Sequence, residues 1–400
     1  MRYSAEYCAL LNTPPWRTGS WRDDEAVERR ESLLLCSFLV WLAKDRVKAR
    51  ARDRDKPLPK SCYNIVLAVR RAHADRGYTM VPAKQIGRTL KHLTTKYAEE
   101  HGYDALLPVR KEPFPPSRVP EFRRISTASV VCGRALDWAA PFFIMIWAVI
   151  CLASSAGFRK AELTVRSGAA FTVRSISRAN LVWRFTNGDG TFRDVANPSA
   201  TRLRALRAGD YALVRPPPSK TDQWGTVFGN QFVFLPFDES DPANAAAALR
   251  DYELAFPLGG RPRSSVPLFS MDPASLDEPL RASTMDAVMA ALFRLIMGAS
   301  RAACFSFHSF RIGVACALLA AGYSHAAIQA HCRWKTDASI QIYARQNAEM
   351  FGARVLAASG QDVSSVVVAN FLRQDLDLDG DATVAIIDGI AGLNAGADDV

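Results

Sequence analysis

The sequence predicts an α+β protein that is mainly helical, with one small antiparallel sheet. Three observations lead to this prediction. Apolar residues recur every three or four positions over most of the chain, which is the period of a helix with one buried face. Only residues 171–237 change to short runs of β-branched and aromatic residues separated by turn residues. A length of 400 residues with 49% hydrophobic content suits two or three domains with sizeable cores.

The net charge of +10 is unevenly distributed along the chain. Residues 1–124 carry +10, residues 125–350 carry +6, and an acidic C-terminal tail at 351–400 carries −6. A basic body indicates a polyanionic partner such as nucleic acid, although a merely solvated surface is an alternative reading of charge alone.

The first part of the chain predicts a small basic helical domain over residues 25–108. Residues 1–24 are rich in Pro, Trp and Arg and show no period, so we expect an extended N-terminal arm there. Within the domain, a basic segment at 44–60 ends in two prolines that interrupt the helical pattern. The helical stretch at 82–101 carries its apolar residues on one face, which leaves basic residues on the others.

Basic side chains of this domain and of the segment that follows it are candidates for contacts with DNA phosphates. An ordinary solvated helical face explains any single one of them equally well. The candidates are Lys84, Arg88, Lys91, Arg123 and Arg124.

Residues 109–124 show a linker pattern. Four prolines and three basic residues fall within 110–120, and a proline-rich chain is stiff and extended. We therefore expect a linker here, followed by a second domain at 125–350. Ser126 or Thr127 can cap the first helix of that domain.

The longest apolar run, residues 138–158, contains 21 residues without a charge. That length could span a bilayer, for which about 18 residues are enough. However, the run is a single segment, and Arg159 follows it directly. A helix buried inside a large domain is apolar on all sides in the same way. We therefore expect a core helix and no membrane partner.

Residues 171–237 predict a small antiparallel sheet in the second domain. The turn sequence Asn187-Gly-Asp-Gly is typical of a hairpin. Helical patterns return at 245–255 and at 283–296 and continue with breaks to residue 358. The expected strands are residues 171–174, 181–185, 211–214 and 231–235.

The cysteines and acidic residues give no indication of a metal site. Eight cysteines are scattered without a C-x-x-C pair, so neither a zinc site nor a disulfide framework is expected. The Asp-rich run at 375–381 resembles part of a calcium loop but lacks the Glu that such a loop needs at its twelfth position. The N-terminus lacks a charged-then-apolar signal pattern, and we expect an intracellular protein.

Two cations upstream are candidates for a phosphate site. Arg159 follows the long apolar run, and Glu162 lies three residues on, where it could orient the guanidinium. A structural Arg–Glu pair is the plainer alternative. Lys220 lies between two expected strands in a proline-rich segment, where an ammonium could protonate a leaving alkoxide or simply be solvated.

Residues 305–345 hold the remaining candidates. His308 and Arg311 have a spacing that puts both on one helical face, although a core histidine would be the favoured explanation for His308 alone. Tyr343 follows Trp334 by nine residues, and a helix cap between them would let the two lie side by side. A phenol has an unperturbed pKa of about 10, so it attacks a phosphate only where cations or a base assist it.

Taken together and in order, these residues resemble the motif of the tyrosine recombinase (phage integrase) family, which shares its active site with type IB topoisomerases. The family's first motif, Gly-hydrophobic-Arg-x-x-Glu-Leu, is matched by residues 157–163. A hairpin Lys, His-x-x-Arg, a His or Trp, and a Tyr nine residues later then follow. The Arg333-Trp334 pair is similar to the eukaryotic DIRS-type and Crypton-like branch, but Cys332 stands where that branch usually has Gly.

The resemblance implies an N-terminal core-binding (SAM-like) domain and a catalytic domain that close around duplex DNA, and usually four protomers on two DNA sites. It implies that Arg159 and Arg311 clamp the scissile phosphate, with His308 and Trp334 completing the pocket. Tyr343 would form a 3′-phosphotyrosine link, and Lys220 would protonate the leaving oxygen. Neither a metal nor ATP would be required, and the protein would be associated with DNA, in the nucleus of a eukaryotic host or otherwise in the cytoplasm.

Two alternatives remain open at this point. A monomeric type IB topoisomerase would share the fold and the site but would relax supercoils. A degenerate relic of a mobile element would bind DNA without cutting it, although the complete residue set argues against that reading.

Overall fold

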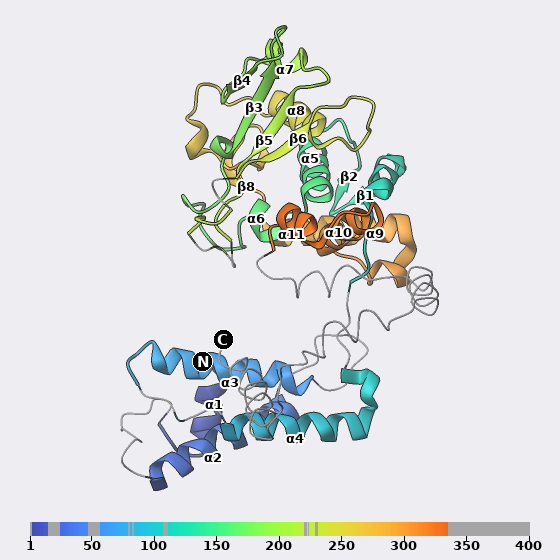
Figure 1. The fold of residues 1–400 in the computed structure, drawn as a ribbon. Helices are drawn as coiled ribbons and strands as arrows, with labels where there is room; N and C mark the ends of the chain where they lie inside the picture. Colours follow the sequence, from blue (N-terminus) through green and yellow to red (C-terminus); the bar gives the residue numbers. More distant parts are fainter. Residues whose placement is uncertain are drawn as a thin grey trace, which may run out of the picture. The chain divides into compact units, whose positions relative to one another are not determined.

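The structure is a computed structural model whose chain divides into two compact units, Met1–Lys111 and Glu112–Val400 (Figure 1). Helices joined to small antiparallel sheets confirm the predicted α+β class. Lys220, Tyr343 and the acidic tail lie outside the described residues. The structure describes residues 2–14, 25–46, 57–78, 81, 84–106, 111–219, 222, 224–228 and 231–334.

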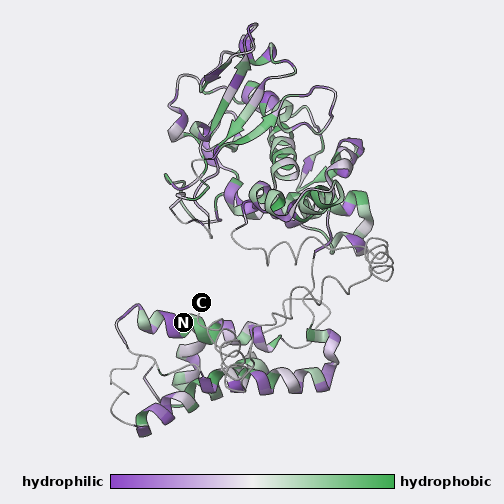
Figure 2. Cartoon of the chain, in the orientation of Figure 1, coloured by the Kyte–Doolittle hydropathy of each residue, from purple (hydrophilic) through white to green (hydrophobic). Residues whose placement is uncertain are grey.

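The first unit is helical. Its core contains Leu39 and Val66 together with Ile86, which are fully buried and come from three different helices. Figure 2 shows hydrophilic and hydrophobic colours alternating along α4, as expected for a helix with one buried face. The elements are α1 (Arg2–Leu10), α2 (Glu25–Trp41), the π-helix η1 (Leu42–Arg46), α3 (Pro59–Ala74), α4 (Lys84–His101) and the 3₁₀ helix η2 (Tyr103–Leu106).

The expected extended N-terminal arm is wrong for residues 2–10, which form α1. Tyr7 is buried, and its ring centroid lies 5.2 Å from that of Phe38 and 5.1 Å from that of Trp41. Packing of an aromatic side chain against α2 stabilises a helix whose sequence alone has no clear apolar period, because most helical stability in proteins comes from tertiary contacts.

The second unit is built around α5 (Pro141–Ala156), which the sequence predicted as a core helix. Thirteen of its residues are buried, and α8 (Ala245–Ala255) packs along it. Pro141 suits a first helical turn, where its missing N–H costs nothing. The residue before it, Ala140, is the N-cap, so the expected cap at Ser126 or Thr127 is wrong. Gly157 ends α5 in the left-handed region with φ 59°.

A four-stranded antiparallel sheet has the strand order β4-β3-β5-β6. Its strands are β3 (Leu181–Thr186), β4 (Phe192–Val195), β5 (Tyr211–Val214) and β6 (Val233–Pro236). The predicted hairpin is present, because β3 pairs with β4 across the Asn187 turn. The strand expected at 171–174 is wrong: these residues lack a pairing partner and Val173 is fully exposed. Two short hairpins were not predicted: β1 (Val130–Val131) with β2 (Arg134–Ala135), and β7 (Ser270–Asp272) with β8 (Ser275–Pro279).

The remaining elements of the second unit are short helices and three longer ones at its C-terminal side. They are η3 (Pro116–Arg124), α6 (Lys160–Leu163), η4 (Arg178–Asn180), α7 (Ala200–Arg204), η5 (Arg263–Ser265), α9 (Ala282–Ala302), α10 (His308–Ala320) and α11 (His325–Cys332). In Figure 1, α10 and α11 lie at one end of α5, close to α6.

Residues 112–124, which were expected to be part of an extended linker, instead belong to the second unit. Phe114 and Phe122 are fully buried and pack on each other with ring centroids 5.2 Å apart. The Phe114 N–H also donates to the Ser309 carbonyl oxygen at 2.9 Å. The prolines shape the 3₁₀ helix η3, and the phenylalanines between them anchor it in the core.

Gly313 in α10 lies directly against this segment. A Cβ at Gly313 would lie 1.9 Å from the Phe114 carbonyl oxygen. We expect Gly313→Ala to lower the free energy of unfolding by about 1–3 kcal/mol, because the packed backbones must move apart. Urea unfolding measures this loss.

Gly87 in α4 is the matched control, since a Cβ there would meet nothing within 4 Å. Gly87→Ala is expected to be neutral or to stabilise the protein by up to about 1 kcal/mol. Equal losses in Gly313→Ala and Gly87→Ala would contradict the close approach of α10 to Phe114.

The helix α9 is long and apolar enough to cross a membrane by length and composition. Its residues Met285, Val288 and Phe293 are buried in the core, and core helices of globular domains pass the same test. Gly298, with φ 76° and ψ 164°, interrupts its helical geometry. A single helix of this kind is weak evidence for a membrane span.

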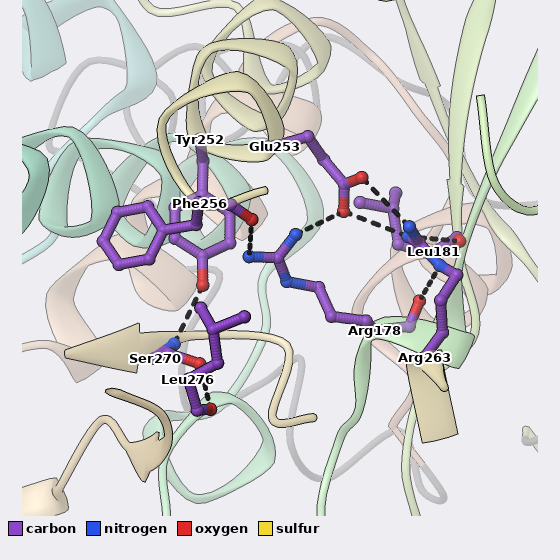
Figure 3. Close-up of polar contacts among 8 residues, drawn as sticks. All are labelled: Arg178, Leu181, Tyr252, Glu253, Phe256, Arg263, Ser270 and Leu276. Carbon is purple, nitrogen blue, oxygen red and sulfur yellow. Dashed lines mark hydrogen bonds and ion pairs between the residues drawn. The ribbon is translucent and has the colours of Figure 1, made fainter. Parts of the chain in front are cut away.

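A buried ion network joins η4, α8 and η5 (Figure 3). The Arg178 guanidinium, which is fully buried, donates to Glu253 Oε1 at 2.8 Å and to the Phe256 carbonyl oxygen at 3.1 Å. Arg263 donates to both oxygens of the same carboxylate at 3.0 Å. The Tyr252 ring lies beneath Arg178, with the guanidinium carbon 4.4 Å from the ring centroid. The network fixes three segments that the chain order separates.

Candidate functional site

Several of the predicted site residues meet at the C-terminal end of α5. They come from three stretches of sequence: residues 157–163, the start of α10, and the end of α11. Gly157 allows the chain to turn sharply away from α5, because its φ of 59° is in the region that side chains with a Cβ disfavour. A Cβ at Gly157 would also contact Cys332 Sγ and Arg311 Cγ, at 3.6 Å and 3.8 Å. The three stretches therefore approach closely at this point.

The last carbonyl groups of α5 accept hydrogen bonds from three basic side chains of α10 and α11. His331 Nε2 donates to the Ser155 carbonyl oxygen at 2.9 Å, and Arg333 Nη1 donates to that of Ala156 at 3.1 Å. Arg311 Nη1 donates to the carbonyl oxygen next along the chain, that of residue 157. Carbonyls at a helix end have no intrahelical partner and carry partial negative charge, so cations stabilise them. The end of α5 thus collects positive charge.

Arg159 and Glu162 form the contact that the sequence predicted. Arg159 is the N-cap of α6, and its backbone N–H donates to Glu162 Oε2 at 2.8 Å. Its Nη1 also donates to Glu162 Oε1 at 2.7 Å. The Glu162 side chain is buried, whereas that of Arg159 is 27% exposed. A fixed carboxylate therefore aims a guanidinium that solvent still reaches.

Arg311 is more deeply placed than Arg159. It is buried, and its Nη2 donates to the Cys332 carbonyl oxygen while Nη1 bonds the end of α5. The guanidinium carbon lies 5.5 Å from the centroid of the Trp334 ring, which is also buried. Burial and, next, the charge of Arg159 lower the pKa of Arg311 to about 10. Arg311 therefore remains a cation at neutral pH.

His308 is the first residue of α10 and lies near both arginines. Desolvation and, next, the positive charges of Arg311 and Arg159 lower the pKa of the His308 imidazole. The neutral imidazole is therefore favoured in the folded protein more strongly than in the unfolded chain. A neutral imidazole can accept or donate a hydrogen bond at an anion without adding repulsion to its two cationic neighbours.

This shift predicts a pH dependence of stability. The unfolded chain binds a proton at His308 more readily than the folded protein does. The contribution of His308 to the free energy of unfolding is therefore fully present above about pH 6.5 and is lost as the pH falls below that value. We expect His308→Gln to lose less stability than the wild type between pH 8 and pH 5.5. Urea unfolding at both pH values measures the difference, and an identical loss in the two proteins would contradict the placement of His308 beside the arginines.

Arg333 belongs to the same cluster, although the sequence indicated it only as half of an Arg-Trp pair. Its guanidinium is buried, lies with its central carbon 4.2 Å from the Phe158 ring centroid, and has Nη2 3.5 Å from Glu162 Oε2. Its backbone has φ 52°, which is unusual for a residue other than glycine. Neither a motif nor a period pointed to this role, because its partners are more than a hundred residues away.

The cluster carries a net positive charge. Three arginines, Arg159, Arg311 and Arg333, surround the single carboxylate of Glu162. An excess of guanidinium groups beside an exposed edge suits a phosphate, which arginine binds through paired hydrogen bonds. In the described part of the chain, no group of three or more His, Cys, Asp or Glu side chains could hold a metal ion.

Lys220 and Tyr343, which the sequence predicted as acid and nucleophile, lie outside the described residues. By chain order Lys220 falls between β5 and β6, as expected. The residues on either side of it, Ser219 and Asp222, pair through two backbone hydrogen bonds of 2.8 Å and 3.1 Å. The Asp222 carboxylate accepts three further backbone N–H groups, from residues 226–228. The described residues Ser219 and Asp222, which precede and follow Lys220 in the chain, are therefore fixed to each other by hydrogen bonds.

The five DNA-contact candidates come from other elements than the cluster, namely α4 of the first unit and η3 of the second. Lys84, Arg88 and Lys91 are exposed on α4 in the first unit. Arg123 covers two indole rings of the second unit, with its guanidinium carbon 4.6 Å from the nearer ring centroid, that of Trp147. Arg124 is exposed at the end of η3. All five side chains are thus exposed, and Arg123 also contacts the two indole rings.

No protein-family model and no curated protein matches the sequence. Among solved structures, the chain is similar to the XerA recombinase, with 13% identity, a TM-score of 0.34, and coverage of 90% of this chain and 100% of that chain. It is also similar to the Tn1549 transposon integrase in complex with transposon right end DNA, with 11% identity, a TM-score of 0.35, and coverage of 90% and 98%. The same integrase in complex with circular intermediate DNA gives 12% identity, a TM-score of 0.34, and coverage of 89% and 98%.

Proposed function

We propose that this chain is a DNA strand-transferase of the tyrosine recombinase type, which breaks and rejoins DNA through a 3′-phosphotyrosine intermediate. The observation that carries the proposal is the cluster at the end of α5, in which Arg159, His308 and Arg311 meet. His308 follows Arg159 by 149 positions and Arg311 follows His308 by 3, in the order and context of the recombinase motif. Chance alone gives no reason for motif residues that far apart to share one cationic cluster.

In the proposed reaction, Arg159 binds the non-bridging oxygens of the scissile phosphate with the donors that solvent reaches. Arg311 lies behind it and contributes a cation that stays charged at neutral pH, because its pKa of about 10 is well above 7. Positive groups fixed before the reaction stabilise the charge that develops in a pentavalent transition state. His308 completes the pocket by hydrogen bonding, and Trp334 shields Arg311 from water.

Bond making and breaking are assigned to the two predicted residues outside the described part of the chain. The Tyr343 hydroxyl gives its proton to a water molecule, its oxygen attacks the phosphorus, and the bond from phosphorus to the 5′ oxygen breaks. The Lys220 ammonium gives a proton to that oxygen, which leaves as a 5′ hydroxyl. Rejoining reverses these steps with a 5′ hydroxyl as the attacking group. The energy of the phosphodiester is kept in the phosphotyrosine, so the reaction as proposed needs neither ATP nor a metal ion.

A pool of nicked suicide duplexes of random sequence tests the proposal, because a nick close to the cut site lets the leaving strand diffuse away and traps the covalent intermediate. The wild type is expected to form a protein–DNA adduct that survives denaturant, and Tyr343→Phe is expected to form none. Absence of an adduct from the wild type would reject the proposed reaction.

The products then distinguish the two catalytic alternatives. A recombinase is expected to exchange flanking sequences between two duplexes and to act as an assembly of protomers, with four proposed here. A type IB topoisomerase would relax a supercoiled plasmid as a monomer. The basic residues of α4, and an exposed Arg124, are proposed to contact the phosphates of double-stranded DNA in either case.

A further inference from the structure

We propose that Arg333 is a positioning residue of this site: it holds the Glu162 carboxylate, and through it the Arg159 guanidinium. The inference rests on the proposed function only in assigning Arg159 to the scissile phosphate. The effect on any phosphate that Arg159 binds follows from the contacts alone.

The backbone of Arg333 is the first observation. It is the C-cap of α11 in a left-handed conformation, with φ 52° and ψ 53°, where glycine is the usual residue. Such a conformation is unfavourable for other residues and persists where its surroundings impose it. The left-handed backbone of Arg333 places its side chain against residues 156–162, which are far from α11 in sequence.

The contacts of the side chain are the second observation. Arg333 Nη1 donates to the Ala156 carbonyl oxygen at 3.1 Å, and the guanidinium covers the Phe158 ring. Its Nη2 lies 3.5 Å from Glu162 Oε2, the same oxygen that accepts the backbone N–H of Arg159 at 2.8 Å. One buried carboxylate is therefore shared between a buried arginine on one side and the partly exposed Arg159 on the other.

Burial decides which of the two arginines can touch a ligand. The Arg333 side chain is 6% exposed, against 27% for Arg159. Arg333 Nε and Nη2 are buried and form no hydrogen bond with the described residues, and Nη2 forms an ion pair with Glu162 Oε2 at 3.5 Å. A charge buried this way is most stable beside a fixed opposite charge. Arg333 thus stabilises Glu162 in one position and acts on a phosphate only through Arg159.

Lysine cannot reproduce this arrangement. The planar guanidinium reaches the Ala156 carbonyl, the Phe158 ring and the Glu162 carboxylate together, whereas an ammonium is a single point charge. Arg333→Lys therefore keeps the charge of the site but releases Glu162. If Arg333 acted only through its charge, this variant would bind phosphate as well as the wild type.

The test uses the full-length chain and inorganic phosphate as the probe. Phosphate raises the unfolding temperature of a protein that binds it in the folded state, and the rise reports the affinity. We expect Arg333→Lys to weaken phosphate binding about fivefold to tenfold and to slow adduct formation on suicide duplexes by a similar factor. In a Glu162→Gln background, Arg333→Lys is expected to have no further effect, because the two residues act in series.

Arg263→Lys is the matched control, since Arg263 also bridges a buried carboxylate and backbone carbonyls but lies in the network of Figure 3. It is expected to lower the unfolding temperature without changing the rise caused by phosphate. The proposal is overturned if Arg333→Lys behaves like this control, if its effect adds fully to that of Glu162→Gln, or if phosphate does not stabilise the wild type at all. Failure of the wild type to form an adduct would reject the proposed function instead, and the phosphate measurements would still decide the role of Arg333.

Discussion

Arg311→Lys is expected to reduce the rate of DNA cleavage about 100-fold to 1,000-fold, which is the size of loss that follows when a preorganised group that stabilises a developing anion is disturbed. The wild-type guanidinium donates to the carbonyl oxygens of Gly157 and Cys332 at once. A lysine cannot bond both, so the end of α5 and the end of α11 would no longer be held together behind Arg159. The rate of adduct formation on a suicide duplex measures the effect.

Two controls separate this loss from a loss of folding. The affinity of Arg311→Lys for uncut duplex DNA should stay close to that of the wild type, because most phosphate contacts are proposed to lie elsewhere. Arg250→Lys should cleave at the wild-type rate, since Arg250 pairs with Glu239 and Asp251 away from the cluster. A cleavage rate within threefold of the wild type in Arg311→Lys would contradict the assigned role.

Glu253→Gln is expected to cause the largest loss of stability. The substitution removes the charge that two arginines share, and Arg178 has no solvent exposure with which to recover its hydration. Breaking a buried pair by removing one partner typically costs about 3–5 kcal/mol. Urea unfolding of the full chain should show this loss in the transition of the second unit.

Asp194→Asn is the comparison for Glu253→Gln, because Asp194 pairs with Arg184 at 2.7 Å on the exposed side of β3 and β4. A surface pair of this kind contributes about 0–1 kcal/mol. Losses of similar size in the two variants would show that the buried network does not stabilise the fold in the way described.

The parts of the fold that sequence predicted best are those with local patterns. The helix α5 is apolar on all sides, and a helix of this kind in a globular domain is usually buried in the core. The hairpin of β3 and β4 has its turn residues at Asn187, and Arg159 lies three residues from Glu162, so both contacts follow from short spacings.

The parts that sequence did not predict depend on distant partners. Phe114 and Phe122 lie in a proline-rich stretch whose sequence resembles a linker. Only its contacts with α10 in the folded structure show that it belongs to the core. Arg178 and Glu253 are 75 residues apart, and no local pattern connects them. Arg333 is separated from Glu162 in the same way, so its role is visible only where α11 meets the end of α5.

The proposed reaction specifies which atom of DNA becomes attached to which side chain. Wild-type adducts recovered from suicide duplexes can be digested and their peptides sequenced by mass spectrometry, with Tyr323→Phe, a change at an exposed tyrosine, as the matched control for Tyr343→Phe. We expect a nucleotide joined to Tyr343 through a 3′ phosphate, a free 5′ hydroxyl on the released strand, and adducts in Tyr323→Phe but not in Tyr343→Phe. Attachment through a 5′ phosphate, attachment to another residue, or an undiminished adduct in Tyr343→Phe would contradict the proposed reaction.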